Sequence, residues 1–231
     1  MNKILVSTIP SWSQQSGANT FSSLLEGIKN VDISSIYFRS DIPDSTVAKH
    51  YFHIVENRVI KSILNSNIKT GEEVQPSTSG MDNENENKLE HKRYAYFSRN
   101  RNCIFLWGRE LLWKLGRWKS PELDKFLDKV RPDVFMFTIE SYPYFNRVNE
   151  YIIKRCKPKK IIIYWWDDNF TYKQNIEERA KVIDKTLSEI VYEDLDELYI
   201  SAPVRRMTWQ TILVLKEITE VMGEAPARVF V

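Results

Sequence analysis

The feature that most constrains the fold is a strand, a polar loop, a helix and a second strand that follow one another at the start of the chain. Residues 3–9 (KILVSTI) form a short run rich in β-branched side chains, typical of a strand buried on both faces of a parallel sheet. After a polar loop at residues 10–19, the apolar side chains at positions 21, 24, 25 and 28 have helical spacing. Residues 31–38 then indicate a second strand. This alternation predicts an α/β protein with an open parallel sheet.

The same alternation returns in the middle of the chain, after a polar interruption. Residues 66–93 are rich in Asn, Glu, Ser and Lys and poor in large apolar residues, which predicts a flexible polar loop. Beyond it, the apolar spacing predicts a helix at residues 120–130 and another at 144–156. Strands are predicted at residues 134–139 and 160–166. The fold class we expect is therefore α/β, with a Rossmann-like open parallel sheet.

Composition narrows the class of protein and its setting. The 231 residues carry a formal net charge of +2, so bulk electrostatics does not favour binding to nucleic acid or to an anionic membrane. Cys103 and Cys156 lie far apart and no secretory signal is recognisable, which favours a reduced, cytoplasmic setting. His50 and His53 are three residues apart, a spacing that would bring them together on a helix, but no third ligand accompanies them. We therefore predict neither a metal site nor a cofactor.

The candidate site residues are polar and come from loops that would follow strands, because ligands of an open parallel sheet bind beyond the carboxyl ends of its strands. They are Gly17, Asn19, Glu140, Ser141, Asp167 and Asp168. Backbone N–H groups near Gly17 and Asn19 suit a phosphate or a sugar hydroxyl, and the carboxylates suit hydrogen bonding or proton transfer. The alternative is that these residues only cap helices and form turns, which Asx side chains favour.

Two longer stretches carry a family resemblance that covers residues 1–174. They are WGRELLWKLGRWKSPELDKFLDKVRPDVFMF and KIIIYWWDDNFTYK, preceded by the strand, loop and helix at the start of the chain. In this order they resemble the N-terminal, acceptor-side domain of bacterial GT-B glycosyltransferases. The resemblance implies sugar transfer to cell-surface polysaccharide or lipopolysaccharide precursors. The partners would be a nucleotide sugar and a lipid-linked or saccharide acceptor. Asp167 or Asp168 would position or deprotonate the acceptor hydroxyl. Because the family's nucleotide-sugar-binding half has no counterpart here, we expect no activity from this chain alone.

Basic and aromatic residues alternate between positions 92 and 119. On a helical wheel Trp107, Leu111, Leu115 and Trp118 share one face, with Arg109 and Arg117 away from it. Tryptophan and arginine suit the headgroup region of an anionic membrane, so we predict a membrane-surface site and peripheral association with the inner membrane face. Its residues are Trp107, Arg109, Trp113, Arg117 and Trp118. The alternatives are a core helix with a solvated back and, less favoured, a nucleic-acid-binding helix.

The end of the chain resembles a different family. Residues 186–231, with ISAPVRRMTWQTILVLKEITEVMGEAPARVFV, resemble the segment that enters the second RuvC part of type II CRISPR RNA-guided DNA nucleases. The spacing of apolar residues predicts a helix at 204–222. The resemblance implies a strand at 228–231 and nucleic-acid contacts through Arg205 and Arg206, for which the alternative is a solvated helix face. The metal-binding residues of that family have no counterpart here. We therefore expect a helical appendage from residue 175 onward, as in a chimera. The alternatives to a glycosyltransferase domain are a nuclease fragment and a non-catalytic interaction module.

Overall fold

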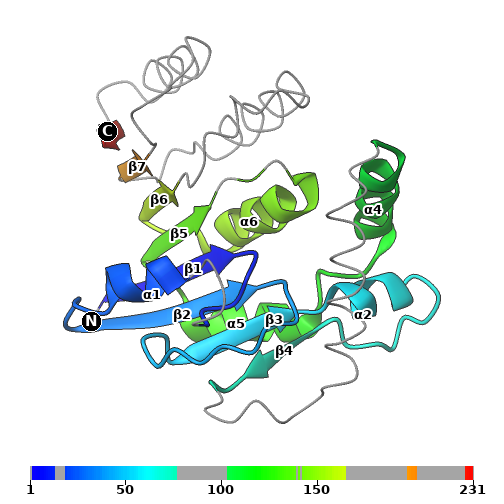
Figure 1. Cartoon of the computed structure of the whole chain (residues 1–231), viewed down its shortest axis with the longest axis horizontal. Helices are drawn as coiled ribbons and strands as arrows, with labels where there is room; N and C mark the ends of the chain where they lie inside the picture. Colours follow the sequence, from blue (N-terminus) through cyan, green and yellow to red (C-terminus); the bar gives the residue numbers. More distant parts are fainter. Residues whose placement is uncertain are drawn as a thin grey trace. The chain divides into compact units, whose positions relative to one another are not determined.

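The computed structural model describes residues 2–13, 19–76, 103–138, 140, 142–164, 197–201 and 227–230 (Figure 1). The chain divides into two compact units. Unit 1 comprises Thr8–Val130, and unit 2 comprises Asn2–Ser7 together with Arg131–Val231.

Unit 1 is built on three strands. β2 (Val31–Tyr37) pairs in parallel with β3 (His50–Ile54), which pairs antiparallel with β4 (Gly71–Val74). The helices of this unit are α1 (Asn19–Leu25), α2 (Glu56–Lys61), α4 (Cys103–Leu115) and α5 (Pro121–Val130). Figure 1 shows α4 beside α2.

The core of unit 1 is aromatic and leaves little spare volume. The rings of Phe52 on β3 and Phe126 on α5 lie 5.0 Å apart between centroids, and both side chains are buried. A Cβ atom at Gly71 would lie 2.5 Å from the Phe52 ring, so only glycine lets β4 approach so closely. The start of α5 is fixed by Ser120, whose Oγ accepts a hydrogen bond from Leu123 N at 3.2 Å.

Unit 2 is a run of parallel strands with one described helix. β1 (Asn2–Thr8), β5 (Val134–Thr138), β6 (Lys160–Tyr164), β7 (Glu197–Ser201) and β8 (Ala227–Phe230) pair in that order. α6 (Pro143–Cys156) connects β5 to β6. Asp133 joins three strands at their amino ends. Its backbone N donates to Lys3 O at 2.9 Å, its carboxylate accepts from Lys3 N at 2.9 Å, and its carbonyl accepts from Lys160 N at 3.1 Å.

The structure confirms a mixed α/β fold with mostly parallel strands, as expected from the sequence. The predicted strands at 3–9, 31–38 and 134–139 correspond to β1, β2 and β5, and the predicted helices at 120–130 and 144–156 to α5 and α6. β6 confirms residues 160–164 of the predicted strand at 160–166. β3 and α2 were not predicted.

Two regions differ from expectation or extend it. β4 lies inside the stretch expected to be a flexible loop at 66–93, so residues 71–74 of that stretch form a strand. Residues 77–93 lie outside the described residues. β6 and β7 lie on either side of residue 174 and pair from Lys160↔Glu197 to Tyr164↔Ser201. β8 coincides with the strand expected at 228–231, whereas the helix expected at 204–222 lies outside the described residues. The boundary at residue 174 stays a prediction.

Candidate functional site

The structure describes only part of the site predicted at the strand ends. Glu140 lies two residues after β5, and its carbonyl accepts a hydrogen bond from Asn146 Nδ2 at 2.8 Å. Asn19 begins α1, as a helix-start residue should. The other predicted residues, Gly17, Ser141, Asp167 and Asp168, lie outside the described residues, as do Arg205 and Arg206.

The pairing of β5 with β6 determines where the chain leaves these two strands. β5 and β6 are parallel neighbours, and their last residues, Thr138 and Tyr164, are paired. The chain therefore leaves both strands at the same edge. Glu140 follows the first strand end in the sequence, and Asp167 follows the second.

Polar side chains are buried at the end of β5 and on the α6 helix that follows it. Thr138, the last residue of the strand, is 2% exposed, and Asn146 and Asn149 of α6 are 3% and 0% exposed. The two asparagines are three residues apart and so lie on one side of the helix. Among the described residues, Thr138 Oγ1, Asn146 Oδ1 and both amide atoms of Asn149 have no hydrogen-bond partner. Buried polar groups are nearly always bonded, so this unused capacity marks the end of β5 as a candidate polar-ligand edge.

Unit 1 contains another group of polar side chains, which was not recognised from the sequence. It lies at the carboxyl ends of β2 and β3, and we call it the Tyr37–His53 cluster, defined as Tyr37, Asp41, His53 and Glu72. The Tyr37 and His53 rings are stacked, with centroids 4.5 Å apart and planes 4° apart. His53 is the strand partner of both Tyr37 on β2 and Glu72 on β4. Arg58 pairs with Glu72 at 2.9 Å.

Burial decides the protonation of this cluster. It raises the pKa of the Tyr37 phenol well above its usual value, and the carboxylates of Asp41 and Glu72 raise it further. Burial lowers the pKa of His53 to about 4, against the opposing effect of the Glu72 carboxylate. Both rings are therefore neutral near pH 7. Neutral imidazole has the chemistry of a general base, and His53 Nε2 is buried and unpartnered among the described residues, as are Thr138 Oγ1 and Asn146 Oδ1. The cluster is therefore a second place where buried hydrogen-bonding capacity is unused.

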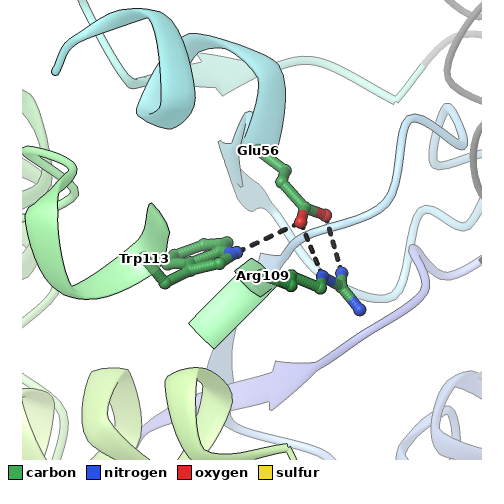
Figure 2. A network of polar contacts seen from close by, with 3 residues as sticks. All are labelled: Glu56, Arg109 and Trp113. Carbon is green, nitrogen blue, oxygen red and sulfur yellow. Dashed lines mark hydrogen bonds and ion pairs between the residues drawn. The ribbon is translucent and has the colours of Figure 1, made fainter. Parts of the chain in front are cut away.

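A further network joins two helices of unit 1 (Figure 2). Glu56, the first residue of α2, accepts two hydrogen bonds from Arg109, from Nε to Oε1 and from Nη2 to Oε2, each 2.6 Å long. Trp113 Nε1 donates to the same carboxylate at 3.2 Å. A Cβ atom at Gly116 would lie 2.5 Å from Val59 Cγ1, so the two helices are closely packed just beyond α4. This network determines which side of α4 faces the protein.

The network revises the expected membrane-surface site. Trp107 is 70% exposed, as such a site requires, but Trp113 and Trp118 are buried and Arg109 is paired with Glu56. The helical wheel misplaced Trp118 because α4 ends at Leu115. The backbone N of Arg117 then bonds Ser62 Oγ at 2.9 Å instead of continuing the helix, while its side chain remains exposed.

No family model, no curated protein and no solved structure matches the chain. Within the described ranges, no group of His, Cys, Asp or Glu side chains has the size and arrangement of a metal site. No described helix has both the length and the apolar character needed to cross a bilayer.

Proposed function

We propose that this chain is the acceptor-side domain of a glycosyltransferase that acts in cell-surface polysaccharide or lipopolysaccharide synthesis. The proposal is supported by the polar residues at the carboxyl ends of β5 and β6. There, Thr138 and Asn146 retain unused hydrogen-bonding capacity, and Glu140 and Asp167 follow the strand ends. An open parallel sheet binds its ligands at this edge, and a saccharide, with many hydroxyl groups, suits a polar lining.

The chemistry assigned to this edge is acceptor activation. Asp167 or Asp168 accepts the proton of an acceptor hydroxyl. The acceptor oxygen forms a bond to the anomeric carbon of the nucleotide sugar, and the bond from that carbon to the diphosphate breaks. The nucleotide diphosphate leaves with the electron pair. Glu140 accepts hydrogen bonds from other hydroxyl groups of the acceptor. We expect this chain, taken alone, to bind the acceptor without transferring sugar to it.

Acceptor binding is tested with the whole chain against a panel of saccharides and lipid-linked saccharides, by calorimetry. The Asp167→Asn/Asp168→Asn pair and Thr138→Val are expected to weaken binding by about two- to tenfold for each hydrogen bond lost. Ser35→Ala is the matched control, because Ser35 is also a buried, unpartnered hydroxyl among the described residues but lies in unit 1. No binding to any saccharide, or equal binding by all variants, would refute the proposal.

Two further measurements separate this proposal from its alternatives. Released nucleotide is measured with UDP-, GDP- and dTDP-sugars, acceptor and divalent metal, and turnover above a heat-killed control would contradict the expected inactivity. The nuclease-fragment alternative predicts a salt-dependent shift of labelled RNA or DNA. An Arg205→Glu/Arg206→Glu variant would abolish that shift. Such a shift without saccharide binding would favour the nuclease fragment over the glycosyltransferase domain.

A further inference from the structure

α4 carries an exposed apolar stripe. Trp107, Leu111 and Leu115 are 70%, 56% and 58% exposed and follow one another at intervals of four residues. Side chains four apart lie on one face of a helix, so the stripe runs about 12 Å along α4. Arg109 and Trp113 lie on the opposite side and are bound to Glu56. Because this inward side is anchored, the stripe is held facing outward.

Among the described residues of α4 and the segment that follows it, the exposed charges are positive. Lys114 lies on the same side of α4 and is exposed, and Arg117 and Lys119 are exposed just beyond the helix end. Glu110, the described carboxylate on α4, is half-buried. Tryptophan and leucine bordered by lysine and arginine form the side-chain set that suits an anionic headgroup layer.

We propose that the stripe of Trp107, Leu111 and Leu115 docks α4 onto the surface of an anionic lipid bilayer. The three side chains enter the boundary between headgroups and acyl chains, and Lys114 and Arg117 contact anionic headgroups. This inference goes beyond the proposed function, because docking requires no sugar, nucleotide or catalytic residue.

A second copy of the chain fits this face less well than a bilayer does. Three side chains present on the order of 300 Å² of apolar surface, well below the roughly 800 Å² per partner of a stable protein interface. A parallel twofold contact through α4 would also bring Lys114 of one copy close to Lys114 of the other. The same positive charge is attracted to an anionic bilayer.

Vesicle flotation of the full chain tests the proposal. One set of vesicles is pure phosphatidylcholine and the other contains phosphatidylcholine and phosphatidylglycerol in equal parts. The wild-type protein is expected to float with the anionic vesicles, less so at high salt, and not with the neutral ones. Trp107→Ser/Leu111→Ser should reduce the bound fraction at least about tenfold, because it removes most of the inserted apolar surface. Lys114→Glu/Arg117→Glu should also reduce the bound fraction, because anionic headgroups repel the new glutamates.

The control is Leu24→Ser on α1, since Leu24 is 54% exposed, close to the value for Leu111, but lies on another helix. It should float like the wild type, and circular dichroism should show that every variant is folded. The proposal is overturned if the wild type does not float with anionic vesicles or floats equally with neutral ones. Unchanged flotation of Trp107→Ser/Leu111→Ser would also overturn it. So would a dimer in size-exclusion chromatography that this double variant abolishes, since the stripe would then be a contact between copies.

Discussion

Replacing His53 by phenylalanine should remove a large part of the acid sensitivity of unit 1. In the folded chain burial lowers the pKa of His53 to about 4, whereas the unfolded chain has the ordinary value of 6.5. Between these values the unfolded state binds a proton that the folded state does not. The free energy of unfolding therefore falls as the pH falls from 6.5 towards 4, and the contribution of neutral His53 is fully present above that window. Phenylalanine keeps an aromatic ring against Tyr37 and does not titrate.

The size of the effect follows from the distance between the two pKa values. From neutral pH to about pH 5, the contribution of His53 to the free energy of unfolding falls by about 2 kcal/mol. At about pH 4 the loss is about 3 kcal/mol. The constant cost of the substitution itself, including the lost hydrogen bond to the backbone of Phe38, is independent of pH. The difference between wild type and variant therefore isolates the titration of His53 from that of the carboxylates.

Urea unfolding followed by circular dichroism, at several pH values from neutral to about 4, measures this difference. We expect the stability gap between wild type and His53→Phe to shift in favour of the variant by about 3 kcal/mol across the window. An NMR titration of the imidazole should give a pKa near 4. A gap that stays constant with pH, or an imidazole that titrates near 6.5, would show that His53 is hydrated and that the stacked geometry does not exclude water.

Three other perturbations test the packing described above, each by urea or thermal unfolding. Glu56→Gln should cost about 1–3 kcal/mol, because the guanidinium opposite it loses a charged, bidentate partner, and unchanged stability would mean that the network contributes nothing. Gly116→Ala should cost about 1–3 kcal/mol, because the new Cβ would lie 2.7 Å from the carbonyl of Val59, whereas Gly27→Ala has open space and should not destabilise through a clash. Deleting residues 176–231 removes β7 from beside β6 but, if the chain has a boundary at residue 174, should leave the melting temperature of the remaining domain within a few degrees. A truncated chain that fails to fold would show that the two parts form one cooperative domain.

The elements that could be predicted from the sequence are those whose burial repeats regularly. In α5, the apolar spacing of Leu123, Phe126, Leu127 and Val130 predicted a helix, and all four side chains are buried. β4 could not be predicted in this way, because its sequence, GEEV, has two glutamates in four residues. Glu72 and Glu73 are stabilised by Arg58 and Lys129, and only the folded chain brings those partners to the strand.

The Tyr37–His53 cluster was missed for a related reason. His50 and His53 were considered as a pair on a helix, where residues three apart meet. They lie instead on β3, and on a strand residues three apart point to opposite faces. The ring that His53 contacts belongs to Tyr37, on a neighbouring strand. The Asp167–Asp168 pair was proposed from its position after a strand, and the described residues end just before it at Tyr164.

The division of the chain between the two units has a consequence for synthesis on the ribosome. β1 precedes unit 1 in the chain but pairs with β5 of unit 2, and the hydrogen bonds between Lys3 and Asp133 span 130 residues. At ribosomal rates of about 5–20 residues per second, β5 emerges roughly 6–26 seconds after β1. Unit 1 is continuous and is complete before then. Throughout that interval the edge of β1 that later pairs with β5 has no strand to bond, so this pairing forms only after unit 1 has been synthesised.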